Sequence, residues 1–452
     1  MIHKYRLFDT NIVVDVNSGA VHVFDDAAYD VLDLYQDHKK EQIIEILSEK
    51  YDKAILEEAI EEIDELVKSG QLFTEDVYRD YIPSWKRNSV VKALCLHVAH
   101  DCNMRCKYCF ASTGDFGCER TLMSADVGKK AIDFLIKSSG KRRNLEVDFF
   151  GGEPLMNFDV VKEIISYARM REKESGKNFR FTITTNALIL NEEHKKYINE
   201  NISNVVLSID GRPEVNDNMR TRVDGSGTYK TILPKIKDMA ESRNQDAYYA
   251  RGTFTRANLD FSKDVLHLAD EGFKQISVEP VVLDEESEWS IRPEDVAAVC
   301  REYEKLALEY VKRRREGRGF NFFHFMIDLE QGPCVAKRLS GCGSGYEYLA
   351  VSPEGDLYPC HQFVGIENFK IGNVNNGIIN EDIVSAFANS NIYSRKECSE
   401  CWARFYCSGG CPANGYKFNK DINIPYKVGC ELEKKRVECA LWIKTQQLLT
   451  NN

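Results

Sequence analysis

Three cysteines in one short loop are the residues of this sequence with the clearest chemistry. Cys102, Cys106 and Cys109 are separated by three and then two residues, and they follow an apolar run rich in β-branched residues. Three thiolates can bind three irons of a 4Fe-4S cube and leave the fourth iron open to another ligand, which makes that iron a reaction site. The alternative is a zinc knuckle, which needs four ligands; His97 and His100, just before the loop, are the available candidates.

A second group of cysteines occupies the last quarter of the sequence. It follows the pattern C-x12-G-x4-C, then C-x2-C-x5-C-x3-C-x18-C, in which Gly355 is the glycine. The seven cysteines are Cys342, Cys360, Cys398, Cys401, Cys407, Cys411 and Cys430. Such a pattern is typical of metal centres, and its C-x2-C element alone also permits zinc ribbons.

Length and composition predict a soluble, cytoplasmic protein of two or three domains. The chain has 452 residues, of which 43% are hydrophobic, and no run of 18 apolar residues occurs. The first residues, MIHKYRLFDT, lack the basic and then apolar stretches of a secretory signal. In a reducing compartment the fifteen cysteines stay available for metal. The net charge of −11 argues against a nucleic-acid partner, and the lack of apolar runs argues against a membrane.

Residues 1–80 predict a small separate domain. Short β runs with an Asn-Ser-Gly turn at 17–19 precede three amphipathic helical stretches, the last of which ends at Gly70. A hairpin followed by three helices is a winged-helix pattern, but the acidic run EEAIEEIDEL does not suit a DNA-recognition helix. The polar, proline-containing residues 74–89 predict a linker.

From residue 90 to residue 315 strands and helices alternate. The strand-like runs are VVKALCLHV, NLEVDFFG, NFRFTITTN, SNVVLSIDG, AYYARGTFT and KQISVEPVV, and helical periodicity follows at 124–139, 157–173, 191–200, 228–241, 260–272 and 293–315. Six such repeats predict an α/β fold with a parallel sheet, most plausibly an open, partial (βα)6 barrel. Functional residues of such a barrel gather at the carboxyl ends of its strands.

Polar residues do stand at those strand ends. Gly151-Gly152-Glu153-Pro154 closes the second strand, where two glycines admit a close ligand and the carboxylate can accept a hydrogen bond from an ammonium group. Thr185, Asn186 and Ser208 end the next two strands, followed by Arg220 and Arg222. Arg251 and Glu279 are charges within the fifth and sixth strands, so they either pair or face the active cavity.

The cysteine loop, with the aromatic Tyr108 before its last cysteine, and the GGEP about 45 residues later resemble those of radical S-adenosylmethionine (SAM) enzymes. The resemblance implies a SAM-binding 4Fe-4S cluster on the catalytic Cys102, Cys106 and Cys109. It also implies SAM contacts from Tyr108, Gly151, Gly152, Glu153, Ser208 and Arg220.

The C-terminal cysteine pattern closely matches the SPASM extension, which holds two auxiliary 4Fe-4S clusters. The match implies that Cys398, Cys401, Cys407 and Cys430 bind the outer cluster, and that Cys342, Cys360 and Cys411 bind the inner one. The inner cluster is then one ligand short. Cys334 is the obvious fourth ligand, and an open iron that receives a substrate thiolate is the alternative. Residues 325–452 are accordingly expected to form a bridging region and a SPASM domain.

The N-terminal domain resembles the peptide-recognition domain of enzymes that modify ribosomally made peptides, where a leader peptide adds a strand to the sheet edge. Over its whole length the chain looks like the clostridial maturases of SCIFF peptides, of the sactipeptide or ranthipeptide type. This implies a cysteine-rich precursor peptide with a leader as substrate, a Cys-to-Thr thioether as product, and a flavodoxin- or ferredoxin-type electron donor.

Two other functions remain as alternatives. Anaerobic sulfatase maturases share the barrel and the SPASM domain, but typically carry an acidic residue after the second inner-cluster cysteine, where this sequence has His361 after Cys360. A non-enzymatic iron-sulfur redox sensor would not need the GGEP and the open-iron loop, so cleavage of SAM separates it from an enzyme.

Overall fold

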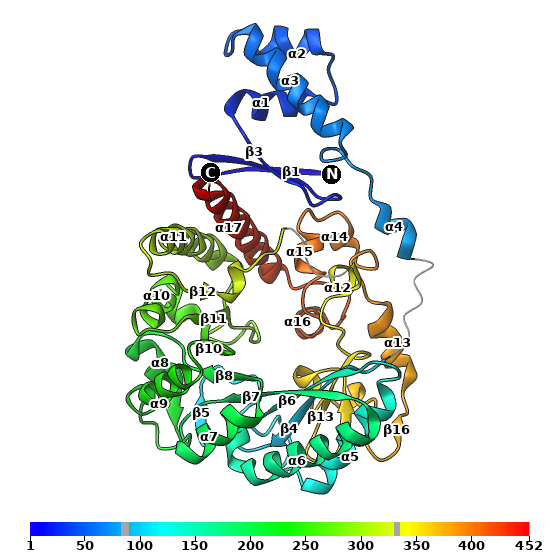
Figure 1. Ribbon diagram of the computed structural model, residues 1–452, viewed down its shortest axis with the longest axis vertical. Helices are drawn as coiled ribbons and strands as arrows, with labels where there is room; N and C mark the ends of the chain where they lie inside the picture. Colours follow the sequence, from blue (N-terminus) through cyan, green and yellow to red (C-terminus); the bar gives the residue numbers. More distant parts are fainter. Residues whose placement is uncertain (83–89, 330–334, 452) are drawn as a thin grey trace.

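The structure, a computed structural model, describes residues 1–82, 90–329 and 335–451. Figure 1 shows an elongated molecule in which the N-terminal sheet and its three helices project from a larger body. The last helix, α17 (Lys427–Asn451), runs from the body toward that sheet and packs against α11 (Val296–Arg315). Both ends of the chain therefore lie near the junction of the two parts.

An antiparallel three-stranded sheet opens the chain. Its strands are β1 (Ile2–Leu7), β2 (Thr10–Asp15) and β3 (Val21–Phe24), hydrogen-bonded in that order. Gly19 has a φ of 79° in the turn before β3, a conformation that strains residues with a Cβ. The helices α1 (Asp26–Leu34), α2 (Lys40–Leu47) and α3 (Lys53–Lys68) follow, and their apolar stripes close over a separate core that includes Val31 and Ile60.

The segment predicted as a linker, residues 74–89, contains a short helix, and its residues 83–89 lie outside the described residues. Residues 77–81 form the short helix α4 (Val77–Tyr81), which Asp76 caps by accepting a hydrogen bond from the backbone amide of Tyr78. Asp76 also accepts a hydrogen bond of 2.6 Å from the hydroxyl of Tyr393 in the C-terminal region. Contacts with a distant part of the chain fix this segment, and local composition does not reveal them.

Six parallel strands form the centre of an 11-stranded sheet and follow one another in chain order, which confirms the predicted α/β fold. They are β4 (Ala93–Ala99), β6 (Asn144–Gly151), β7 (Asn178–Thr185), β8 (Asn204–Ser208), β10 (Tyr248–Phe254) and β11 (Gln275–Pro280). The main connecting helices are α5 (Ala125–Ser138), α6 (Phe158–Ser175), α7 (Glu192–Asn201), α9 (Tyr229–Ser242) and α10 (Ser262–Asp270). Ser124 and Asn191 cap α5 and α7 through their side chains, so local sequence sets these helix starts.

A small second sheet joins the cysteine loop to the chain after β8. Within it β5 (Met104–Cys106) pairs antiparallel with β9 (Arg220–Arg222), and Cys106 lies opposite Arg220. The helix α8 (Pro213–Met219) leads into β9. The sequence did not predict this pairing, because three-residue strands carry no periodic signal.

The C-terminal region continues the main sheet. β13 (Tyr348–Val351) lies parallel to β4, and β14 (Asp356–Tyr358), β15 (Gly372–Asn373) and β16 (Gly377–Ile378) extend it. At the other edge β12 (Asn321–Phe322) pairs with β11. The remaining helices are α12 (Val335–Ser340), α13 (Glu381–Asn389), α14 (Lys396–Ser399), α15 (Arg404–Cys407) and α16 (Pro412–Asn419). Because β13 is built on the first strand of the barrel, the C-terminal region is joined directly to the strand that leads into the cysteine loop.

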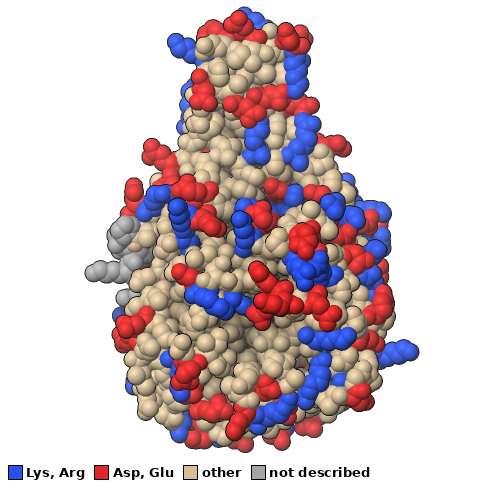
Figure 2. Space-filling model, turned by 180° about the vertical axis from the view of Figure 1, so that it is seen from behind, with Lys and Arg blue, Asp and Glu red and all other residues tan. Residues whose placement is uncertain are grey.

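The surface shown in Figure 2 carries acidic and basic side chains side by side over the body, and acidic side chains gather at the far end of the N-terminal part. Across residues 1–82, 90–329 and 335–451, none of the helices combines the length and the hydrophobicity that a membrane crossing requires.

Candidate active site

The loop with Cys102, Cys106 and Cys109 leaves β4 at its carboxyl end. The backbone amide of Met104 donates a hydrogen bond to Cys102 Sγ (3.4 Å), and both Cys102 and Cys106 lie close enough to Cys109 to feel its charge. Burial raises the pKa of Cys102 to about 12 and that of Cys106 to about 11. The three thiols therefore share one partly buried space and keep their protons until a metal centre displaces them.

Three glycines allow the backbone to pass close to this loop and to the strand before it. A Cβ on Gly152 would lie 2.1 Å from the carbonyl oxygen of Asp101, and Gly151 has a φ of 128°. Gly114, which the sequence analysis did not single out, has a φ of 95°, and a Cβ there would lie 2.6 Å from Cys102 Cβ. A larger residue at Gly152 or Gly114 would require the cysteine loop to move, and one at Gly151 would meet the backbone of Ala99 at the end of β4.

Glu153 connects the ends of β6 and β7. Its carboxylate is fully buried and accepts hydrogen bonds from the backbone amides of Leu155 (3.0 Å) and Asn186 (2.7 Å) and from the hydroxyl of Thr185 (2.8 Å). Asn186 Nδ2 in turn contacts Cys102 Sγ at 3.6 Å. The sequence analysis expected the Glu153 carboxylate to bind an ammonium group. The same carboxylate also fixes the turn at Asn186, which lies against Cys102.

Tyr108 and Arg220 meet at a buried carboxylate that the sequence analysis missed. The Tyr108 hydroxyl lies 2.8 Å from both carboxylate oxygens of Asp210, and Arg220 Nη1 donates to that hydroxyl at 2.8 Å. Burial raises the pKa of Asp210 to about 6, and the nearby Arg220 charge opposes this rise. Arg220 Nε is buried without a hydrogen-bond partner among the described residues, so this N–H can donate to a bound ligand.

The fifth and sixth strands place an ion pair at the barrel end. Ser208 is half-buried at the end of β8, opposite Arg251 of β10. Arg251 forms an ion pair of 2.7 Å with Glu279 of β11, so the two charges pair, and Glu279 also lines a cavity. Arg222, by contrast, donates to the Thr231 hydroxyl away from this pair.

A cavity of about 430 Å³ lies between the barrel end and the C-terminal region. His324 Nδ1 lies 2.8 Å from Arg436 Nη1 on its wall. A guanidinium only donates, so this nitrogen accepts, and burial together with the Arg436 charge lowers the pKa of His324 well below its usual value. The cavity also exposes three cysteines of the C-terminal group, Cys407, Cys411 and Cys430.

His361 faces the cysteine loop from the C-terminal region. Its ring centre lies 5.6 Å from that of Phe110, which follows Cys109, and 5.2 Å from that of Phe150. Burial, and then the Arg251 charge, lower the pKa of His361 to about 4. A neutral imidazole among aromatic rings therefore occupies the position after Cys360.

The seven C-terminal cysteines lie in two groups. Cys360 is close enough to Cys342 and Cys411 to feel their charges, and burial raises its pKa well above the usual value. The second group is formed by Cys398, Cys401, Cys407 and Cys430, whose thiols act on one another in the same way. Cys334, the expected fourth ligand of the first group, lies outside the described residues.

The surroundings of the buried Arg395 indicate whether these thiols suit an anionic cluster. Its side chain is 4% exposed, and it donates to the Ser390 hydroxyl at 2.9 Å and to the carbonyl oxygen of Gly409. Within the described part of the chain no carboxylate pairs with it, and the nearby charges that favour its cationic form are thiols of both groups: Cys398, Cys407, Cys411 and Cys342. A buried cation needs compensating negative charge, and thiolate-bound iron-sulfur clusters would supply it.

The two histidines that could complete a zinc site with the cysteine loop are paired with each other. Within residues 1–82, 90–329 and 335–451 no three or more His, Cys, Asp or Glu side chains, those of the cysteine groups included, are arranged to hold a metal ion, so this geometry does not separate zinc from iron-sulfur ligation. His97 Nδ1 lies 3.1 Å from His100 Nε2, so the two imidazoles that precede the loop contact each other. Burial lowers the pKa of both, which keeps them neutral.

Two family models match regions that contain cysteines of these groups. A family described as "4Fe-4S single cluster domain" matches residues 91–233, and the SPASM family, described as "Iron-sulfur cluster-binding domain", matches residues 342–402. A cysteine-type anaerobic sulfatase-maturating enzyme of Clostridium novyi is 25% identical over 340 residues, which cover 72% of this chain and 87% of that enzyme.

Two solved structures share the fold at 18% identity. The structure of native anSMEcpe with bound AdoMet has a TM-score of 0.65 and covers 80% of this chain, with all of its own chain matched. Streptococcus suis SuiB bound to S-adenosylmethionine has a TM-score of 0.54, covers 94% of this chain and is itself 98% matched. Two regions of the chain thus match iron-sulfur cluster families, and its fold is that of these AdoMet-bound structures, so the chain is similar to radical SAM/SPASM maturases of peptides and proteins.

Proposed function

We propose that this chain is a radical SAM maturase that forms thioether bonds between a Cys sulfur and a carbon, first of all a Thr carbon, in a ribosomally made cysteine-rich precursor peptide. The observation that carries the proposal is the combination in one chain of three features: an N-terminal sheet whose β3 edge pairs with no further strand among the described residues, a barrel-end cysteine loop, and two further cysteine groups beside a cavity. Each part has a task in such a reaction, from binding the leader to accepting an electron.

The barrel end is the proposed cofactor site. Cys102, Cys106 and Cys109 would hold the 4Fe-4S cluster, and the backbone at Gly151 and Gly152 would cradle SAM. When bound, these groups supply one-electron cleavage of SAM and the removal of a hydrogen atom from an unactivated carbon. Glu153 holds the cradle through its three hydrogen bonds.

Arg220 and Ser208 complete the proposed SAM contacts. The buried, unpartnered Nε of Arg220 can donate to the carboxylate of the amino acid part of SAM. Tyr108 and Asp210 keep the guanidinium in place, because its Nη1 is already bound to the Tyr108 hydroxyl. Ser208, half-buried at the end of β8, is the proposed ribose contact.

The leader peptide is proposed to bind along β3 (Val21–Phe24). In the order β1-β2-β3 the other edge strand, β1, is in contact with α17: the Tyr5 hydroxyl donates to the carbonyl oxygen of Glu438 at 2.9 Å. Val23 of β3 is 46% exposed, as expected of a strand that can accept a partner. Main-chain hydrogen bonds to β3 would then hold the leader, and neighbouring side chains would select it.

The C-terminal cysteine groups are proposed to bind the two auxiliary clusters. Bond formation turns a C–H and an S–H into a C–S bond: one hydrogen atom leaves with the cofactor fragment, and one proton and one electron must leave the peptide. An auxiliary cluster beside the cavity is a suitable acceptor for that electron. Either Cys334 or a substrate thiolate would complete the ligands of the inner cluster, and a flavodoxin- or ferredoxin-type protein would supply the first electron.

Maturation of a sulfatase is the second candidate, supported by the identity with the Clostridium novyi enzyme. The N-terminal part and His361, in place of an acidic residue, favour the peptide-crosslinking reading. A redox sensor, the third function considered, would not cleave SAM.

A three-way assay separates these functions. The reconstituted enzyme is incubated anaerobically with SAM, a reductant and either a cysteine-rich precursor peptide, a sulfatase-derived peptide or no peptide. We expect SAM cleavage in all three and a modified product from the precursor peptide alone. A modified sulfatase peptide would favour the second candidate, and the absence of SAM cleavage would refute the enzyme.

A further inference from the structure

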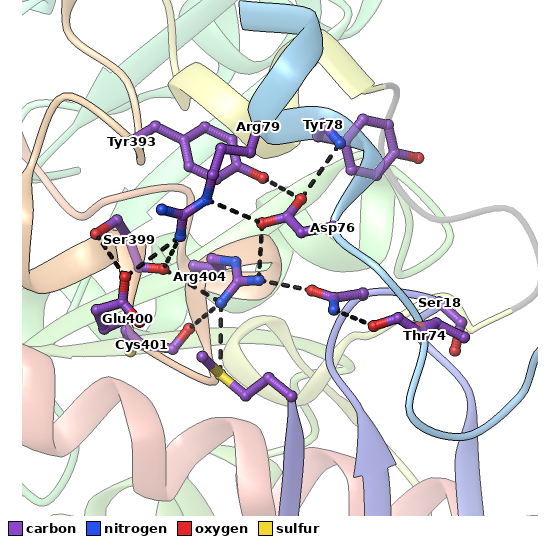
Figure 3. Close-up of polar contacts among 12 residues, drawn as sticks. Ser18, Thr74, Asp76, Tyr78, Arg79, Tyr393, Ser399, Glu400, Cys401 and Arg404 are labelled. Atoms are coloured by element: carbon purple, nitrogen blue, oxygen red, sulfur yellow. Dashed lines mark hydrogen bonds and ion pairs between the residues drawn. The ribbon is translucent and has the colours of Figure 1, made fainter.

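One buried arginine ties the N-terminal part to the loop of the outer cluster cysteines. Arg404, 2% exposed, stands between Cys401 and Cys407 in the sequence. Its guanidinium donates to Asn17 Oδ1 at 2.6 Å and to Asp76 Oδ2 at 3.1 Å, both from the N-terminal part. It also donates to the carbonyl oxygens of Ser399 and Cys401, each at 3.4 Å. Figure 3 shows these contacts converging on the one guanidinium.

The partners of Arg404 are themselves held in place. Asp76 accepts a hydrogen bond from the Tyr393 hydroxyl at 2.6 Å, and Asn17 Nδ2 donates to the carbonyl oxygen of Thr74 at 2.6 Å. Thr74 is fixed in turn by Asp15, which accepts a hydrogen bond from its backbone amide. The β2–β3 turn, the segment before α4 and the loop of the outer cluster cysteines therefore form one hydrogen-bonded unit (Figure 3).

Apolar contacts join the same segments. Val16, which directly follows β2, packs in one small core with Phe405 and with Cys398, which is a proposed cluster ligand. The His3 ring of β1 stacks on Trp402, with ring centres 3.7 Å apart and planes 4° from parallel. The N-terminal sheet thus contacts the stretch from residue 398 to residue 407 through polar and apolar groups.

We propose that Arg404 is a positioning residue of the outer auxiliary cluster, and that through Asp76 and Asn17 the N-terminal part belongs to the environment that sets the redox properties of this cluster. The inference rests on the proposed cluster ligands, and it does not require the thioether reaction. It assigns the peptide-binding part a second task besides recognition.

Electrostatics predict the direction in which the reduction potential of the outer cluster should change. The Asp76 carboxylate offsets the charge of Arg404, and the reduction potential of a cluster depends on nearby net charge, hydrogen bonds and exposure. Removing the Asp76 charge leaves the Arg404 cation uncompensated beside the cluster loop and favours the more negative, reduced cluster. A peptide that moved this unit by docking on the sheet would act on the cluster, and the redox state of the cluster would act equally on peptide affinity.

The test uses the full chain with Cys102, Cys106 and Cys109 replaced by alanine, so that only the auxiliary clusters contribute to the spectra. In this background Asp76→Asn is compared with Glu61→Gln, which makes the same charge change in the N-terminal part but on an exposed side chain of α3 paired with Lys40. Potentiometric EPR measures the midpoint potential of each auxiliary cluster, and iron content and thermal unfolding are recorded for every variant.

We expect one auxiliary potential to rise in Asp76→Asn and neither to change in Glu61→Gln. Arg79→Gln is a second, safer variant: Arg79 is half exposed, pairs with Glu400 at 3.3 Å and donates to the carbonyl oxygen of Ser399, so loss of its charge should lower the same potential. Unchanged potentials in folded Asp76→Asn and Arg79→Gln would overturn the inference, as would equal shifts in Glu61→Gln. Absence of auxiliary iron would overturn the ligand assignment and the inference together, whatever the outcome of the peptide assay.

Discussion

Replacing Arg395 by glutamine should lower the reduction potentials of both auxiliary clusters. The guanidinium is buried, is unpaired with any carboxylate in the described part of the chain, and is surrounded by thiols of both cysteine groups. Two unit charges about 8 Å apart interact by about 2 kcal/mol at an effective dielectric constant of about 20. For a one-electron couple this corresponds to about 90 mV. Loss of the cation penalises the reduced clusters by that amount, so both potentials should fall by about 90 mV.

The assay is a potentiometric EPR titration of the reconstituted full chain, with Arg395→Lys as the matched control. Lysine keeps the charge but cannot span the Ser390 hydroxyl and the Gly409 carbonyl as the guanidinium does. We expect its potentials to lie close to those of the parent protein. If glutamine leaves both potentials unchanged while iron content stays the same, the reasoning that places Arg395 between two anionic clusters is refuted. A fall in one potential alone would mean that the charge acts on one cluster only.

Three further predictions concern the barrel. Gly152→Ala would place a Cβ 2.1 Å from the Asp101 carbonyl oxygen, and such overpacking costs about 1–3 kcal/mol. SAM affinity should therefore fall roughly tenfold to a hundredfold in equilibrium dialysis. Unchanged affinity would contradict the proposal that the backbone at Gly152 holds SAM. Tyr108→Phe removes the hydroxyl that donates to buried Asp210 and should cost about 1–3 kcal/mol in denaturant unfolding; a smaller loss would mean that water replaces it. Burial, and then repulsion by a neighbouring glutamate, raise the pKa of Asp148 to about 6. This raised pKa favours the fold at low pH, and the contribution is lost as pH rises from the usual carboxyl range through about 6. Between pH 5.5 and pH 7.5 Asp148→Asn should gain about 1 kcal/mol of stability relative to the parent protein, and a constant difference would contradict the raised pKa.

The sequence predicted the barrel well because its elements carry local signals. Each of the six predicted strands and the six predicted helices after residue 90 has its counterpart, since alternating burial and helical periodicity are written into short stretches such as Asn144–Gly151 and Ala125–Ser138. Cysteine spacing predicted the candidate cluster ligands in the same way, because ligands on one loop must keep fixed intervals.

What the sequence did not reveal depends on partners far apart in the chain. The pairing of Met104–Cys106 with Arg220–Arg222 sets Arg220 opposite Cys106, and Asp210 becomes important only because Tyr108 reaches it across the fold. Gly114 lies in a glycine-rich loop, and its own need for glycine comes from its close approach to Cys102. Nothing in the sequence around Arg395 indicates that the fold buries it.

Mass spectrometry of a cysteine-rich precursor peptide after anaerobic incubation with the reconstituted enzyme, SAM and dithionite tests the central claim most directly. The proposed function predicts the loss of two hydrogens for each bridge, in a product that resists reduction and alkylation. Cleavage of SAM with an unchanged peptide mass, under conditions where the peptide binds the enzyme, would contradict thioether formation.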